Sequence, residues 1–440
     1  MMLARRALYM SLISLTLAAF ASGCAPQHDI TEDDDTLGTT EEALSIAAHR
    51  EHVSGDLFHT TFDVRIGVSA NAVLRIHRVT RELAPGVPRP SKHAVMMLHG
   101  DFATFVTNFL PTAGDPASTV SGLAKYLASR DVDVWGLDRR WTLPGQDGDT
   151  SDFAAMGVVQ ELDDLDRAIT FARATRLATG SGGDKIALAG FSHGGELAYA
   201  FAARDGGRPK KLRQISALAP LDVYYDIAPA DADLRAYACA NAAAESDSLA
   251  QGVVDVPNDF FISLGQLDRS APLDTSPLFG PPFTNRDAMY YTAGLTHQFA
   301  PYTPLYHLLA PVLDGDGNVA SLRFTGEDAA SAWFAGAPPH QSLREGAELD
   351  AIWCGTPPSG ADAPLSNITV PVFYLGAAGA FGDHGLFTTT QLGTSDVTTV
   401  VVHKLGAEAL AEDFGHGDLL FAADAKQAAW SPLAAWLIAH

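Results

Sequence analysis

Short apolar runs alternate with segments of helical periodicity over much of this chain, and this alternation limits the possible folds most. Four runs, "HAVMMLHG", "DVDVWGLDRR", "KIALAG" and "RQISALAP", have the continuous apolar character of strands buried on both faces of a sheet. Between the second and third, residues 152–179 repeat apolar side chains on one helical face: Val158, Leu162, Leu165 and Ile169. Strands that alternate with helices predict a mostly parallel central sheet flanked by helices, in the α/β class.

A pair of alternating segments precedes this series. "TFDVRIGV" places every second apolar residue on one side, and "AVLRIHRV" follows after a Ser-Ala-Asn turn. Period-two patterns on both sides of a short turn predict a β-hairpin. We expect this hairpin to add an antiparallel edge to the sheet.

The alternation stops at about Val223 and returns after Ser366 with "ITVPVFYLG", "SDVTTVVVHKL" and a last helix. The interrupting segment is rich in Ala, Pro and aromatic residues and contains short helical pieces such as "LRAYACANAAAE" and "EDAASAWFAGA". It is longer than a plain connection between two elements of a sheet. The sequence therefore predicts a core formed by 51–222 and 367–440, with a large, mainly helical cap over 223–366.

The N-terminus has the pattern of an export signal. Two arginines precede an apolar stretch of about 14 residues, which is too short to span a bilayer, so 1–23 is predicted to be a signal peptide. The flank "TLAAFASGC" resembles the processing site of bacterial lipoproteins, in which the cysteine, here Cys24, becomes the acylated first residue. The alternative is an ordinary cleavage near Ala21. We expect an exported protein, lipid-anchored in the bacterial cell envelope (periplasm or outer surface) or secreted.

Residues 24–50 are predicted to be a disordered acidic tether, because "HDITEDDDTLGTTEEA" lacks periodicity and has few apolar residues. The whole chain has 52 acidic and 29 basic residues, a net charge of −23. Such a surface repels nucleic acid and anionic head groups, so we expect no nucleic-acid partner and membrane contact only through the lipid anchor.

Two cysteines remain after Cys24, and both lie in the predicted cap. An even pair in an oxidising compartment predicts a disulfide between Cys239 and Cys354; two buried free thiols are the alternative. The cap also contains "DGDGN" at 314–318, which opens like a calcium loop but lacks the glycine and distal glutamate at the required offsets. We interpret it as a tight turn between two strands.

The stretch "KIALAGFSHGG" places Ser192 where a buried strand meets a helix. A sharp turn of this kind lifts a hydroxyl clear of the sheet, and the flanking glycines let the turn close. The helix that follows directs its amide groups and its positive end toward the same place, where negative charge would develop. Ser192 is therefore predicted to be a nucleophile.

A serine nucleophile needs a base, and the base needs an acid that holds its tautomer. His416 in "EDFGHGDLLFA" lies between the last strand and the last helix and is the predicted base. Asp383 in "AAGAFGDHGLF" is the preferred acid, although it lies far past its strand, and Asp222 directly after "ISALAP" is the alternative. We expect Asp418 to order the loop of the base.

The oxyanion of such a reaction needs two backbone N–H donors. The first is predicted at Asp101, which follows "MMLHG", with Phe102 as the alternative. The second is His193, directly after the nucleophile. The side chain of His193 is predicted to line the site.

These motifs, "LHGD", "GLDRRW", "GFSHGG" and "GHGDLLF", resemble those of the α/β-hydrolase superfamily in position and order, over about 90–223 and 366–440. The last region is similar to the histidine region of lipase-type and esterase-type members. The resemblance implies a triad of Ser192, Asp383 and His416 and an oxyanion hole at Asp101 and His193. The mechanism of such a triad requires no metal or organic cofactor. The displaced acid departs from the pattern of the family.

The expected function is a secreted serine hydrolase that cleaves a small-molecule or lipid-like carboxylic ester through an acyl-enzyme. An amidase or peptidase with the same triad is an alternative, and a non-catalytic surface lipoprotein with this fold is another. The sequence leaves open the acyl chain length and the oligomeric state. Eight cap aromatics belong either to an acyl pocket or to the core of the cap: Tyr224, Tyr225, Phe260, Phe261, Tyr290, Tyr291, Trp333 and Trp353.

Overall fold

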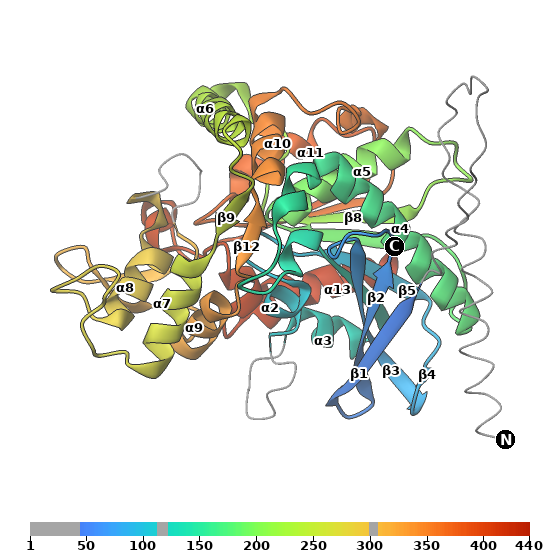
Figure 1. Cartoon of the computed structure of the whole chain (residues 1–440), viewed down its shortest axis with the longest axis horizontal. Coiled ribbons are helices and arrows are strands. Elements are labelled where there is room, and N and C mark those ends of the chain that lie inside the picture. The colour runs from blue at the N-terminus through green and yellow to red at the C-terminus, as the bar shows by residue number, and fades with distance from the viewer. Residues whose placement is uncertain (1–44, 112–121, 299–306) are drawn as a thin grey trace.

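The computed structural model describes residues 45–111, 122–298 and 307–440 (Figure 1). The predicted signal peptide, Cys24 and most of the predicted tether lie outside the described residues. The end of the tether prediction is wrong, because strand β1 begins at Ile46. β1 pairs antiparallel with β2 and is mostly exposed, so its backbone pairing holds it in place and its side chains leave little apolar signal in the sequence.

The central sheet has the strand order β1-β2-β3-β6-β5-β7-β8-β13-β14, and β4 pairs with β3. The first three strands are antiparallel, β3 is antiparallel to β6, and the strands from β6 to β14 are parallel to one another. The predicted hairpin is β2 and β3. The strand bounds are β1 (Ile46–Ser54), β2 (Leu57–Arg65), β3 (Val73–Ala84), β4 (Val87–Pro88), β5 (His93–Leu98), β6 (Val132–Asp138), β7 (Ile186–Phe191), β8 (Ile215–Leu221), β13 (Val372–Ala377) and β14 (Val397–Val402).

The middle of this sheet is buried on both faces, as the continuous apolar runs require. Every residue of β6, β7 and β13 is buried. Helices α4 and α5 pack on one face and α3 and α13 on the other (Figure 1). The four apolar residues that the helical spacing singled out in α4 are all buried. The core helices are α2 (Phe105–Phe109), α3 (Leu123–Ala128), α4 (Val158–Ala178), α5 (His193–Gly206), α11 (Leu386–Thr389), α12 (Asp418–Phe421) and α13 (Ser431–Ala439).

The predicted cap segment is mainly helical and lies between β8 and β13. It also contains two small antiparallel sheets, β9 with β12 and β10 with β11. The stretch 314–318 is the turn between β10 and β11, as interpreted from the sequence. The cap elements are α6 (Ala232–Ala250), β9 (Asp255–Pro257), α7 (Asp259–Ser270), α8 (Asn285–Gly294), β10 (Pro311–Leu313), β11 (Val319–Leu322), α9 (Glu327–Ala335), β12 (His340–Ser342) and α10 (Leu343–Cys354).

A disulfide joins Cys239 of α6 to Cys354 at the end of α10, and these two helices lie side by side in the cap (Figure 1). The start of α10 is also fixed to the core. The Ser342 hydroxyl caps the helix by accepting from the Glu345 N–H and donates to the Met156 carbonyl at 2.7 Å. The cap is therefore attached to the core next to the carboxyl ends of the parallel strands.

Within the described ranges, no helix is both long and apolar enough to cross a membrane. The carboxyl ends of β5, β7, β8 and β13 meet at one edge of the sheet, where loops from distant parts of the chain come together. Ligand sites of open α/β sheets form at this edge. The candidate site lies there, under the cap.

Candidate active site

Ser192 stands alone between β7 and α5 in a strained backbone conformation. Its φ of 56° and ψ of −135° lie outside the regions that non-glycine residues ordinarily adopt. Such a conformation costs about 1–3 kcal/mol and persists only where the surroundings enforce it. The Ser192 N–H donates to the carbonyl of Leu221 at 3.0 Å, which ties the turn to the end of the neighbouring strand β8.

The glycines around Ser192 allow the close backbone packing that holds this turn. A Cβ atom on Gly190 would lie 2.0 Å from the carbonyl oxygen of Gly194, and one on Gly194 would lie 2.4 Å from the His99 oxygen. Neither position can hold a larger side chain without moving the backbone. The helix α5 then begins at His193, with its first N–H groups next to the serine.

The base predicted from the sequence meets a carboxylate in the structure. His416 lies just before α12, is 4% exposed, and its ring stacks on Phe191 with the centroids 4.3 Å apart. Its Nδ1 is 2.6 Å from Oδ2 of Asp222, which is fully buried. An Nδ1–H that donates to a carboxylate leaves Nε2 as the acceptor nitrogen of a neutral imidazole.

The carboxylate of Asp222 is fixed by its own backbone and by a second loop. Its φ is 50°, and its N–H donates to the Leu375 carbonyl at 2.6 Å. Its Oδ1 accepts from the N–H of Ala377 at 2.8 Å and from the N–H of Gly382 at 3.1 Å. Both oxygens are therefore occupied, and only Oδ2 faces the histidine.

Asp383, the preferred acid of the sequence analysis, does not contact His416, so that assignment is wrong; Asp222, the alternative, occupies the position. Asp383 is exposed, in the short turn Gly382–Gly385. The loop after β13 does not bring its carboxylate to His416; instead, its Gly382 N–H donates to Asp222, which follows β8. The distance from the end of the strand could have identified the correct residue. Asp222 directly follows β8, whereas a turn separates Asp383 from β13.

Asp418 lies where the sequence analysis expected it, as the organiser of the loop that carries His416. Its Oδ2 accepts from the N–H groups of Ala310 and Gly415, and its Oδ1 accepts from the Thr325 hydroxyl. Burial raises the pKa of this carboxyl to about 6. The loop is thus attached to the cap as well as to the core.

The loop after β5 brings Asp101 next to Ser192. The Gly100 N–H is already used, since it donates to the Asn108 side chain at 2.9 Å, and the Phe102 N–H lies 3.4 Å from the Gln341 side chain. The N–H groups of Asp101 and His193 make no backbone hydrogen bond to any described residue. These two N–H groups, and not that of Phe102, remain for an oxyanion.

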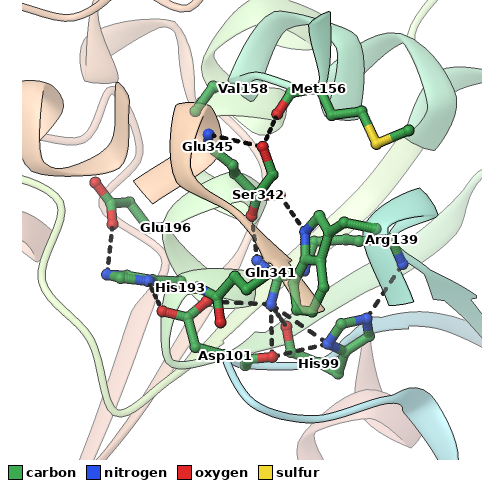
Figure 2. Close-up of polar contacts among 12 residues, drawn as sticks. His99, Asp101, Arg139, Met156, Val158, His193, Glu196, Gln341, Ser342 and Glu345 are labelled. Atoms are coloured by element: carbon green, nitrogen blue, oxygen red, sulfur yellow. Dashed lines mark hydrogen bonds and ion pairs between the residues drawn. The ribbon is translucent and has the colours of Figure 1, made fainter. Parts of the chain in front are cut away.

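The side chains of Asp101 and His193 are bonded to each other, which the sequence analysis did not foresee. Asp101 accepts from Nδ1 of His193 (Figure 2). Burial works against both charges, but the His193 ring and the Arg139 guanidinium hold the pKa of Asp101 below its usual value, and Asp101 holds the pKa of His193 above its own. Each residue therefore favours the charged form of the other.

Glu196, one turn into α5, is fully buried beneath His193. Its Oε2 is 3.9 Å from Nε2 of His193, and neither oxygen has a hydrogen-bond partner among the described residues. Burial, together with the nearby Asp350 and Asp101 carboxylates, raises its pKa well above the usual value. The surroundings of Glu196 therefore favour the protonated form of its carboxyl group.

A cavity of about 340 Å³ contains Ser192 and His416 and extends under the cap. Four of the eight cap aromatics considered in the sequence analysis line it: Tyr224, Phe261, Trp333 and Trp353. Phe102, Phe334 and Phe381 add further apolar wall. The other four cap aromatics do not line this cavity. One side of it is thus suited to an apolar substrate group.

Part of the cavity lining is acidic, a feature that the sequence analysis did not predict. Glu245 and Asn241 of α6 and Asp350 of α10 line it. Burial and the neighbouring Asp350 raise the pKa of Glu245 to about 7, and burial raises the pKa of Asp350 to about 6. Both carboxyls therefore change charge near neutral pH.

No cluster of three or more His, Cys, Asp or Glu side chains with the spacing of a metal site occurs in the described part of the chain. The arrangement around Ser192 consists of a hydroxyl on a strained turn, a histidine held by a buried carboxylate, and two backbone N–H groups. These are the parts needed for acyl transfer through a serine.

Comparisons with known proteins place the fold. No protein-family profile matches the sequence, and no curated protein matches it. A solved structure from Sulfolobus solfataricus, described as a candidate lipase, is 15% identical with a TM-score of 0.58, over 90% of this chain and 99% of that chain. A monoglyceride lipase of Saccharomyces cerevisiae is 11% identical with a TM-score of 0.42, over 84% and 93%. Juvenile hormone epoxide hydrolase of Bombyx mori is 11% identical with a TM-score of 0.40, over 87% and 78%.

The similarity to the Sulfolobus structure extends over nearly the whole of both chains. Because the identity is low, this similarity establishes the fold alone. This chain itself has a mostly parallel sheet with an antiparallel edge and helices on both faces. The chain has the α/β-hydrolase fold.

Proposed function

We propose that this protein is a serine hydrolase that cleaves carboxylic esters, with Ser192 as nucleophile, His416 as base and Asp222 as the acid that orients the base. The observation that carries the proposal is the 2.6 Å bond between His416 Nδ1 and the buried Asp222 carboxylate, next to a serine on a strained turn in the same cavity. Strain of this kind is typical of functional positions.

The chemistry follows from the geometry. Nε2 of His416 takes the proton of Ser192 as the hydroxyl oxygen attacks the ester carbonyl. The N–H groups of Asp101 and His193 stabilise the oxyanion that forms. His416 then protonates the leaving alcohol. A water molecule, activated by the same histidine, attacks the acyl-enzyme and releases the carboxylic acid, which restores Ser192.

The apolar wall of the cavity supports an ester with an apolar acyl or alcohol group. An amide or peptide substrate would use the same residues, and the cavity contains nothing that favours it over an ester. We propose in addition that the protein works outside the cytoplasm, anchored through Cys24 or secreted. The disulfide between Cys239 and Cys354 supports this, because disulfides persist in oxidising compartments.

The proposal is tested with a fluorophosphonate probe and short p-nitrophenyl esters, on the mature protein and on Ser192→Ala. We expect the mature protein to be labelled and to hydrolyse the esters, and the variant to do neither. No labelling of the mature protein would overturn the proposed function. Labelling without ester hydrolysis would direct the search to amides.

A further inference from the structure

Arg139 holds the loop that carries the first oxyanion donor. It directly follows β6 and is 1% exposed. Its Nη2 donates to the carbonyl of His99 at 3.1 Å and to the carbonyl of Gly100 at 2.5 Å, and its backbone N–H donates to Nε2 of His99 at 3.2 Å (Figure 2). One residue thereby fixes the two carbonyl groups that precede the Asp101 N–H.

The same guanidinium reaches the second oxyanion donor through Asp101. Nη2 lies 3.4 Å from Oδ1 of Asp101, whose Oδ2 accepts from His193. The side chains of the two residues whose N–H groups face the oxyanion are therefore bonded to each other. Because one N–H group comes from the loop after β5 and the other from the start of α5, this bond fixes their separation, which neither segment fixes alone.

The cap supplies the counterion that holds Arg139 in place. Glu345, in the first turn of α10, pairs with Nη1 of Arg139 through Oε1 and accepts from Nε1 of Trp141 at 2.5 Å through Oε2. Burial works against the guanidinium, but the Glu345 and Asp101 carboxylates hold its pKa above the usual value. The charge is buried, so it depends on these two partners.

We propose that Arg139, the Asp101 carboxylate and the cap residue Glu345 form a positioning system that sets the geometry of the oxyanion hole, so that closure of the cap on the core is required for full transition-state stabilisation. The inference rests on the proposed hydrolase function. None of the three side chains touches the reacting atoms. Their effect is expected on the transition state and not on the binding of the ground state.

The test uses Asp101→Asn, Arg139→Lys and Glu345→Gln in the full mature protein. Asparagine keeps the backbone N–H and most of the shape but weakens the bond to His193, and lysine cannot make the forked contacts of the guanidinium. The matched control is Glu348→Gln on the same helix. Glu348 also joins cap to core, through the Val158 N–H at 2.7 Å, but makes no contact with the oxyanion loop.

Three measurements separate positioning from mere folding: kcat and KM for a p-nitrophenyl ester, the Ki of a trifluoromethyl ketone that forms a tetrahedral adduct with the serine, and Tm. We expect kcat to fall about 10–100-fold for Asp101→Asn and Arg139→Lys and about 3–10-fold for Glu345→Gln, with KM nearly unchanged. Removal of an oxyanion donor typically lowers kcat about 10²–10³-fold, and a misplaced donor should lower it by part of that factor. The Ki should rise by the same factor as kcat falls.

Glu348→Gln should change kcat and Ki less than about 2-fold, whatever its Tm. If Arg139→Lys does not fold, the two isosteric variants still decide. A Ki that stays constant while kcat falls, or a rise in KM alone, would overturn the positioning role. Fluorophosphonate labelling of the unsubstituted protein keeps the two proposals apart: without labelling both fail, whereas a labelled protein with unaffected Asp101→Asn and Glu345→Gln variants overturns only this inference.

Discussion

At the scale of single residues, the site depends on carboxylates whose surroundings give them different tasks. Asp222 is fully buried and bonded by two backbone N–H groups and by His416, so the direction of its side chain is fixed. Glu196 is as deeply buried but has no hydrogen-bond partner among the described residues, and its pKa is raised well above the usual value. The two side chains thus differ in their hydrogen bonds and not in their burial.

Asp222→Asn tests the acid. The amide can donate but not accept at the position facing Nδ1, so it favours the wrong tautomer of His416. We expect kcat for an ester to fall about 10⁴-fold, as is typical when the acid of a Ser-His-Asp triad becomes an amide, with little change in KM. Asp383→Asn is the matched control and should keep full activity. Equal losses in the two variants would contradict the assignment of Asp222.

The acidic wall of the cavity predicts a pH-dependent preference between substrates. The pKa values of Asp350 and Glu245 are raised to about 6 and about 7, so both groups are neutral at pH 5 and ionise as the pH rises toward 8. Ionisation repels an ester that carries its own carboxylate. We expect kcat/KM for p-nitrophenyl hemisuccinate, relative to a neutral p-nitrophenyl ester, to fall about 3–10-fold between pH 5.5 and pH 8.5.

The ratio of the two kcat/KM values cancels any pH effect on the steps that both substrates share. The double variant Glu245→Gln and Asp350→Asn should flatten the ratio across this pH range. Asp247→Asn, an exposed position on α6, serves as the control and should leave the ratio as it is in the unsubstituted protein. A ratio that is independent of pH in the unsubstituted protein would count against the acidic wall as part of the substrate site.

At the scale of elements, the cap is a set of helices joined by loops and small sheets, held together by specific connections. The disulfide between α6 and α10 closes a loop with a sequence separation of 115. The two helices also carry the acidic wall, and α10 carries Glu345. The alignment of α6 with α10 therefore affects both the shape of the cavity and the residue that pairs with Arg139.

Removal of the disulfide should lower the stability of the cap. A cross-link over a loop of this length restricts the unfolded chain, and loss of a native disulfide typically costs about 2–4 kcal/mol. We expect Cys239→Ser with Cys354→Ser to lower Tm by several degrees in thermal unfolding followed by circular dichroism. Ala243→Ser, an exposed change on α6, controls for the added hydroxyl. Under reducing conditions the Tm of the unsubstituted protein should approach that of the double variant. If the two proteins have the same Tm without a reductant, the expectation is wrong.

At the scale of the whole molecule, charge is strongly unbalanced. A net charge of −23 destabilises the compact state through repulsion between acidic groups, and dissolved salt screens this repulsion. We expect Tm at pH 7.5 to rise when NaCl increases from about 0.02 M to about 0.3 M, over which the Debye length shortens from about 20 Å to about 6 Å. Differential scanning calorimetry measures the change.

Two comparisons make that measurement specific. Choline chloride at the same ionic strength should raise Tm as NaCl does, because screening does not depend on the cation. At pH 5 the increase should be smaller, since carboxyls with raised pKa values, such as Asp350 and Asp418, are then mostly protonated. A Tm that falls with salt at pH 7.5 would show that attractive ion pairs outweigh the repulsion.

Much of the fold could be predicted from the sequence because it is encoded locally. Buried strands gave continuous apolar runs, and α4 gave a helical face whose four apolar residues are all buried. β1 was missed for the corresponding reason: an exposed edge strand is held by backbone pairing with β2 and needs no apolar pattern of its own. The prediction of a disordered tether failed at β1 because the side chains of this strand show no alternating apolar pattern.

The sequence by itself determined that Ser192 stands on a turn between strand and helix and that His416 follows the last strand, because strand, turn and helix patterns arise from near neighbours. Only the tertiary structure decided that Asp222 and not Asp383 meets His416, a contact across 194 positions of the chain. It also decided that Glu345 of the cap pairs with Arg139 of the core, across 206 positions. Such contacts depend on how the strands order in the sheet and where the cap folds back, and the local pattern around each residue contains neither.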